Sequence, residues 1–241
     1  MRRSLFIAAA LMLMASVAVA SVPPIAWFAD DFNAIPDDTC LRSAPSGDWS
    51  GTGPENKVYG GEVRMKSVSG DENDTDSYKT TSVAHLSQGV SPQIFHCIVR
   101  GEKPNPGDEG NFAHISVNES SGASMADWYG WATQLTPRYS GGTGDQVDLS
   151  DGAWHDLDII YDPVTGLTQW YADNVLKLSV NQTTGYAVER CELFTYSRTD
   201  VVEQYVWVDH VALGTVPEPS SLIALSTFGI GMIGYIKRRR A

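Results

Sequence analysis

The chain has 241 residues with a formal net charge of −12 at pH 7, and 42% of its residues are hydrophobic. Binding to nucleic-acid phosphates needs clustered Lys and Arg, so the acidic charge excludes nucleic acid as the expected partner. The length suffices for one domain that buries a sizeable core without the help of disulfides.

The N-terminus has the layout of a secretory signal peptide. Arg2 and Arg3 precede an uncharged apolar run, and Ala18-Val19-Ala20 supplies a small-x-small pattern before Ser21. This order predicts a signal peptide at residues 1–20 with cleavage after Ala20. The apolar run is shorter than the ~20 residues of a membrane-spanning helix, which disfavours a resident membrane segment.

The segment from Ser21 to about Val216 is predicted to be all-β. Long helical periodicity is absent, and short β-type runs recur between Gly, Pro, Asn and Asp. Roughly ten or more short strands at this spacing favour an antiparallel two-sheet β-sandwich, or jelly roll. The clearest predicted strands are residues 62–66, 93–100, 112–117, 154–161, 167–171, 175–178, 191–197 and 205–213.

The acidic run Asp71-Glu72-Asn73-Asp74-Thr75-Asp76 carries the oxygen ligands that calcium prefers. It lacks the glycine at position six and the closing glutamate of an EF-hand loop. We interpret it as a solvated acidic loop, with a cation site as the alternative.

The densest aromatic patch is Trp128-Tyr129-Gly130-Trp131. Trp128 and Trp131 are candidate glycan-binding residues, because the C–H faces of sugar rings suit aromatic surfaces. Core packing is the favoured interpretation of the two, since buried aromatic side chains dominate the cores of β-sandwiches.

Two hairpins are predicted between residues 154 and 178. Asp162-Pro163-Val164-Thr165-Gly166 supplies a proline that fixes a turn and a glycine available for positive φ. Asp173-Asn174 forms the second turn, because Asp and Asn tolerate the left-handed region.

This hairpin region resembles a known family. Residues 153–162, Gly166 and residues 170–174 are similar to the Trp-His … Tyr-Asp … Gly … Tyr-x-Asp-Gly hairpin of laminin-G-like, concanavalin A-like jelly rolls. Asn174 departs from the usual Gly but suits the same turn. The resemblance implies a jelly roll over residues 21–214, with Asp30-Asp31-Phe32 in the first strand and residues 208–211 in the last.

The resemblance also implies a candidate calcium site. First and last strands of jelly rolls often lie side by side, and related carbohydrate-binding sandwiches hold calcium there. Asp30, Asp31 and Asp209 are therefore the candidate metal ligands, for a structural calcium ion, by analogy of fold.

Catalysis is not expected. Glucanases on this fold carry Glu-x-Asp-x-x-Glu on one strand, whereas Asp156-Leu157-Asp158 has the alternation but neither glutamate. No Gly-x-Ser-x-Gly or His-x-x-x-His pattern is present, and the five histidines are scattered. We therefore predict a non-enzymatic, lectin-like domain, with a secreted glycoside hydrolase as the alternative because two carboxyls can meet by chance.

Cysteine usage gives no redox or zinc motif. The chain has Cys40, Cys97 and Cys191 and no C-x-x-C pattern. In an exported chain two of the three cysteines can pair, and all three pairings stay open.

The C-terminal tail has three parts in order. Pro217-Glu218-Pro219 precedes an uncharged stretch, Leu222 to Ile236, and the basic cluster Lys237-Arg238-Arg239-Arg240 follows. Basic residues beside an apolar run stay in the cytoplasm, so the chain before Leu222 lies outside. As a helix the stretch reaches only about 22 Å, a marginal membrane span that snorkelling by the terminal cations assists.

This tail resembles the PEP-CTERM sorting signal over residues 215–241. The resemblance implies an exosortase-type processing enzyme as partner and an inner-membrane anchor that is later cleaved. It also implies a producer of extracellular polysaccharide, and a destination at the cell surface or in the matrix. An ordinary single-pass tail anchor is the alternative.

Overall fold

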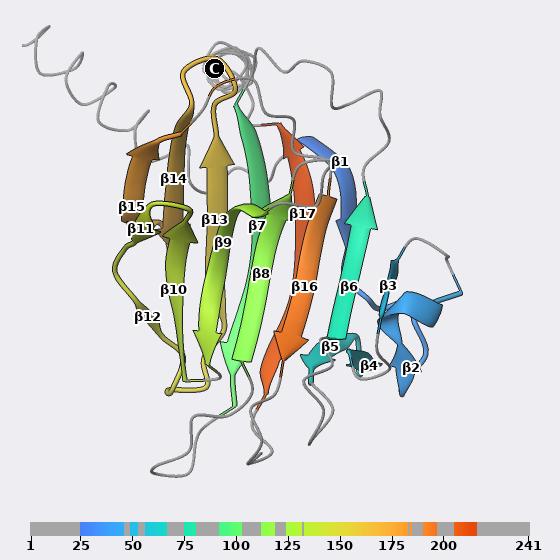
Figure 1. The fold of residues 1–241 in the computed structure, drawn as a ribbon. Coiled ribbons are helices and arrows are strands. Elements are labelled where there is room, and N and C mark those ends of the chain that lie inside the picture. The colour runs from blue at the N-terminus through green and yellow to red at the C-terminus, as the bar shows by residue number, and fades with distance from the viewer. Residues whose placement is uncertain are drawn as a thin grey trace, which may run out of the picture.

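The computed structural model describes one β-sandwich (Figure 1). The predicted signal peptide, acidic residues 71–74 and the whole tail beyond Thr215 lie outside the described residues. Within them the helical element is a 3₁₀ turn at Leu41–Ser43, and no helix there is long and apolar enough to cross a bilayer. The described residues are 25–45, 49–52, 56–66, 75–80, 92–102, 112–118, 124–131, 133–182, 184, 190–196 and 205–215.

The first layer is a nine-stranded antiparallel sheet. Its strand β1 (Ile25–Asp30) pairs with β17 (Val206–Thr215), so the first and last strands lie side by side as predicted. The order of the others across the sheet is β15 (Val175–Asn181), β14 (Leu167–Ala172), β13 (His155–Tyr161), β7 (Gln93–Gly101), β17, β5 (Glu62–Met65), β4 (Lys57–Tyr59) and β2 (Thr39–Cys40).

The second layer is an eight-stranded antiparallel sheet, in front in Figure 1. Its strand β12 (Val147–Asp148) pairs with β10. The order of the others is β11 (Gly142–Thr143), β10 (Gln134–Tyr139), β9 (Ser124–Trp131), β8 (Phe112–Asn118), β16 (Arg190–Tyr196), β6 (Thr75–Thr80) and β3 (Ser50–Thr52). The predicted all-β, two-sheet jelly roll is confirmed.

The core fills the space between the sheets because alternate residues of each strand point inward. Trp128 on β9 and Trp170 on β14 are among its largest fully buried side chains. The Trp170 Nε1 donates a hydrogen bond to the main-chain oxygen of Asp127 at 3.1 Å, which ties one sheet to the other. Cys97 on β7 and Cys191 on β16 are also buried, whereas Cys40 is half-buried.

Both predicted hairpin turns form, for the reasons that the sequence indicates. Asp162 Oδ1 accepts a hydrogen bond from Val164 N at 2.8 Å, and Gly166 has a φ of 74°. A side chain at Gly166 would place its Cβ 2.2 Å from the Gln182 carbonyl oxygen, so glycine is required there. Asp173 and Asn174 have φ values of 50° and 65°, as a type I′ turn demands.

His155 links the turn of the second hairpin to the loop that precedes β13. Its Nδ1 lies 2.8 Å from Asp173 Oδ2, and its Nε2 lies 3.4 Å from Asp151 Oδ1. Asp173 Oδ1 also accepts a hydrogen bond from Asp156 N at 3.0 Å. Burial lowers the pKa of His155, but the two carboxylates outweigh it and leave the pKa above its usual value of 6.5.

Replacing His155 with glutamine is expected to destabilise the domain most in mild acid. The pKa of His155 is raised in the folded state, so its contacts with Asp173 and Asp151 contribute their full stability below the unfolded pKa of 6.5. That contribution is lost as the pH rises through the folded pKa of His155. The carboxylates are half-exposed, so the loss is about 0.5–1 kcal/mol. Denaturant unfolding of wild type and His155→Gln at about pH 5.5 and about pH 8.5 measures it. If wild type and His155→Gln differed equally in unfolding free energy at both pH values, protonated His155 would not be the stabilising form.

Candidate functional site

Polar and aromatic side chains gather on the outer face of the eight-stranded sheet. Residues that pair directly across neighbouring strands share a face, so the strand register lines them up in rows. The first row, here the polar row, consists of Arg138, Asp127, Ser116 and Glu192 on β10, β9, β8 and β16. The next row, here the aromatic row, consists of Thr136, Tyr129, His114 and Phe194 on the same strands.

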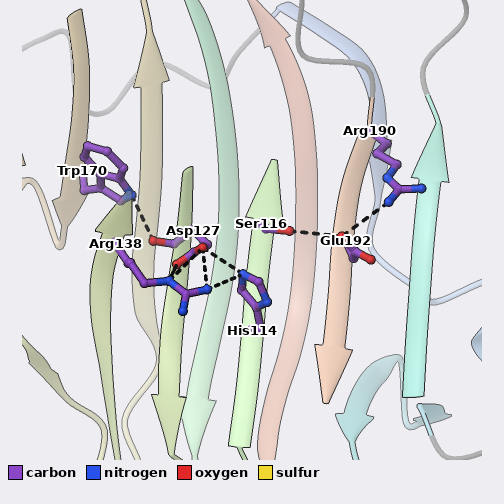
Figure 2. Close-up of polar contacts among 7 residues, drawn as sticks. All are labelled: His114, Ser116, Asp127, Arg138, Trp170, Arg190 and Glu192. Atoms are coloured by element: carbon purple, nitrogen blue, oxygen red, sulfur yellow. Dashed lines mark hydrogen bonds and ion pairs between the residues drawn. The ribbon is translucent and has the colours of Figure 1, made fainter. Parts of the chain in front are cut away.

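Asp127 is the centre of this face, as Figure 2 shows. Arg138 donates from Nε to Asp127 Oδ1 and from Nη2 to Asp127 Oδ2, each at 3.0 Å. His114 Nε2 lies 2.9 Å from the same Oδ2. Burial of the carboxyl raises its pKa, but the hydrogen bonds and charges of His114 and Arg138 dominate and leave the pKa of Asp127 below its usual value.

Arg138 is held between an acid and an aromatic ring. Its guanidinium carbon lies 4.3 Å from the centre of the Tyr129 ring, and its side chain is 37% exposed. The Asp127 carboxylate beneath it is only 4% exposed. The ion pair therefore presents guanidinium N–H groups to solvent in a fixed orientation, because the carboxylate and the ring fix its plane.

Glu192 occupies the other end of the polar row. Its Oε2 accepts a hydrogen bond from Ser116 Oγ at 3.4 Å and lies 3.8 Å from Arg190 Nη2 (Figure 2). His114 contacts the Phe194 ring edge-on, with 5.8 Å between ring centres. Asp127 and Glu192 are two strands apart, which separates their backbones by about 9–10 Å.

Trp128 lies in the core, as the core-packing interpretation predicts, and is not part of a glycan-binding platform. Trp128 is fully buried in the core, whereas Trp131 lies half-buried on the outer face beside the aromatic row. Side chains alternate along a strand, so residues three apart point to opposite faces. Trp131 and Tyr129 share the outer face instead.

Two of the three candidate calcium ligands, Asp30 and Asp31, accept hydrogen bonds from other groups. Asp30 Oδ2 accepts a hydrogen bond from Trp49 Nε1 at 2.7 Å, and its Oδ1 accepts one from Phe32 N at 2.9 Å. Asp31 is exposed and accepts a hydrogen bond from Asn33 N. Asp209 lies at a bulge of β17. Over the described parts of the chain, no three His, Cys, Asp or Glu side chains come together as a metal site, so calcium stays a prediction.

The sequence interpretation did not identify Asp127, Arg138, His114 and Glu192 as a site. A signal exists within single strands, since polar and apolar residues alternate at His114-Ile115-Ser116 and at Asp127-Trp128-Tyr129. That alternation assigns these side chains to one face of each strand. It does not say which strands become neighbours or in which register they pair.

The comparison with protein families gives one match, in the C-terminal segment of the chain. Residues 215–241 match the PEP-CTERM protein-sorting motif. The predicted sorting signal is therefore confirmed, and the motif implies an exported chain that an exosortase sorts. A comparison with curated protein sequences gave no match.

Several solved structures share the fold. An endo-1,3-β-glucanase from Streptomyces sioyaensis superposes with a TM-score of 0.56 at 10% identity, covering 80% of this chain and 98% of that one. The metal-free carbohydrate recognition domain of Emp46p gives 0.55 at 10% identity, with the same coverages. A β-glucanase from Bacillus licheniformis gives 0.51 at 13% identity, covering 78% and 97%. The neighbours thus include a lectin-type domain and glucanases. They establish that the chain has a concanavalin A-like jelly-roll fold, and they do not determine its function.

Proposed function

We propose that this chain is an exported envelope or matrix protein whose jelly roll binds polysaccharide without cleaving it. The observation that carries the proposal is the Asp127–Arg138 ion pair beside Tyr129 and Trp131 on the outer face of the eight-stranded sheet. The PEP-CTERM match supports export, exosortase processing and anchoring of the C-terminus before release to the surface or matrix.

The chemistry of this face suits a sugar polymer. Oriented guanidinium N–H groups donate to ring and hydroxyl oxygens, and the Glu192 carboxylate accepts from hydroxyls. Tyr129, Trp131 and Phe194 add aromatic surfaces against which C–H faces can stack. The rows run across neighbouring strands, so an extended polymer would contact several of them at once.

The ionisation of Asp127 argues against its acting as the general acid of a glycosidase. An inverting glycosidase needs one carboxylic acid with a raised pKa and a second carboxylate about 6.5–9.5 Å away. The pKa of Asp127 is lowered, because Arg138 and His114 stabilise its charged form. It is therefore a poor proton donor, and its carboxylate serves to hold Arg138 in place.

Replacing Tyr129 or Trp131 with alanine is expected to weaken polysaccharide binding by at least about tenfold, or about 1.4 kcal/mol, because each removes an aromatic contact. A glycan array with the purified protein, followed by titration of the best ligand, measures the effect. Leu176→Ala is the matched control, since Leu176 is 46% exposed on the other sheet. Unchanged affinity in both aromatic variants would refute the assignment of this face.

A glycoside hydrolase is the second candidate, favoured by Asp127 and Glu192 lying in one row. The same purified protein, incubated with its best ligand, distinguishes it from a lectin. New reducing ends that disappear in both Asp127→Asn and Glu192→Gln would replace the binding proposal with an enzymatic one. Bound polymer that stays intact supports the lectin-like function.

A further inference from the structure

The opposite face of the sandwich carries a second ordered row, on the nine-stranded sheet. Arg100 on β7 pairs with Trp207 on β17, Trp207 pairs with Arg64 on β5, and Arg64 pairs with Lys57 on β4. Trp154 extends this line just before β13. We call these five residues the cation–aromatic row. It crosses four strand spacings, or about 19 Å.

The planar groups of this row are stacked. The Arg100 guanidinium carbon lies 4.9 Å from the ring centres of both Trp154 and Trp207. The Arg64 guanidinium carbon lies 4.5 Å from the Tyr59 ring centre and 5.0 Å from that of Tyr205. Cations over aromatic faces are attracted by the ring quadrupole, so both guanidinium groups have fixed positions.

The row is positively charged on an otherwise acidic domain. Of the 17 Lys and Arg, six lie in the signal and tail segments, against one of the 29 Asp and Glu, so the domain carries about −17. Arg100 pairs with Glu62 and Lys57 with Asp38, both at about 2.8–2.9 Å. Arg64 has no carboxylate within 4.0 Å among the residues that the structure describes. Arg64 is therefore a cation without a carboxylate partner among the described residues, on a domain whose net charge is negative.

The row retains hydrogen-bonding capacity and exposed surface. Arg64 Nε and Trp207 Nε1 are buried donors with no acceptor within the described part of the chain. Trp154 is 40% exposed, and the side chains of Arg100 and Lys57 are 28% and 26% exposed. An anionic partner would contact the exposed parts of Trp154, Arg100 and Lys57, and the two buried donors lie beneath that surface.

We propose that the cation–aromatic row binds an acidic polysaccharide, one whose sugars carry carboxylates. Guanidinium groups match carboxylates in shape and charge, and the exposed indole of Trp154 beside Arg100 suits a sugar ring. Arg100 and Arg64 lie two strands apart, about 9–10 Å, a spacing that repeating charges along an extended polymer can meet. The charges of the row disfavour an apolar partner. Its three cations, Lys57, Arg64 and Arg100, are too few to bind a nucleic-acid backbone.

This second surface does not depend on the first. The two sheets face in opposite directions, so one domain would contact two polymer chains at once. Such a bivalent protein would cross-link a matrix, because its two sites hold different polymer chains.

Arg100→Gln and Trp154→Ala are expected to weaken binding to polygalacturonate about tenfold, since Arg and Trp anchors dominate interfaces. Affinity electrophoresis of the mature full chain in mild detergent, in gels with polygalacturonate or neutral dextran, measures it. Wild type should be retarded by polygalacturonate alone, and added salt should abolish the retardation. Lys177→Gln removes a cation outside the row and should change nothing, and Tyr129→Ala tests the other face separately. Thermal melts of each variant verify folding.

Several outcomes would overturn the assignment. Equal retardation by dextran and polygalacturonate would show that binding does not depend on the carboxylates of the polymer. Polyglutamate or vesicles of phosphatidylglycerol that compete better than polygalacturonate would identify an acidic protein or a lipid surface instead. If the Arg100→Gln and Trp154→Ala variants fold and bind like wild type, the cation–aromatic row does not bind the polymer and its stacking only stabilises the sheet.

Discussion

Replacing Trp128 with alanine is expected to lower the free energy of unfolding by about 3–5 kcal/mol, the usual cost of emptying a buried aromatic site. The side chain is fully buried between the sheets, so its removal leaves a cavity that neighbouring strands cannot fill. Trp131→Ala, three residues along the same strand, should cost less than about 1 kcal/mol because its side chain lies on the outer face.

Urea unfolding of the two variants beside wild type measures the contrast. Trp128→Phe provides an intermediate step, since it keeps an aromatic ring and removes the indole Nε1, which has no hydrogen-bond partner among the described residues. Its loss should be smaller than that of Trp128→Ala. Similar losses for Trp128→Ala and Trp131→Ala would mean that β9 does not present these residues to opposite faces.

Replacing Pro217, Glu218 and Pro219 with alanines is expected to block processing almost completely while leaving export and anchoring intact. Because proline disfavours helix and biases the residue before it towards extended backbone, we expect Glu218 to be accessible to a processing enzyme. The apolar stretch and the basic cluster after it are untouched, and we expect these to retain and orient the tail. Full-length anchored protein should therefore accumulate.

Fractionation of a host that contains the matching exosortase, followed by blotting, measures the accumulation. Ser220→Ala with Ser221→Ala is the matched control, because it changes neighbouring residues and keeps both prolines and the glutamate. Deleting residues 222–241 should release the domain with no anchored intermediate. Wild-type protein that remained uncleaved and membrane-bound in such a host would reduce the tail to a plain anchor.

The sequence determined the features that are local. The turn at residues 162–166 follows from the side chain of Asp162 and the positive φ of Gly166. The turn at Asp173-Asn174 follows from residues that tolerate the left-handed region. The sorting tail is equally local, since its three parts are contiguous, and the match at residues 215–241 confirms it. The alternation of strands and turns sufficed for the two-sheet fold.

Only the tertiary structure decided which side chains meet. Arg138, Asp127 and Glu192 come from three strands, and β16 joins β8 although more than seventy residues separate them. The cation–aromatic row likewise unites strands from both ends of the domain. Register between distant strands depends on the packing of the whole core, and a shift by one residue would turn every side chain to the other face. The sequence therefore favoured core packing for the aromatic run at 128–131, but only the structure separated the buried Trp128 from the half-buried Trp131.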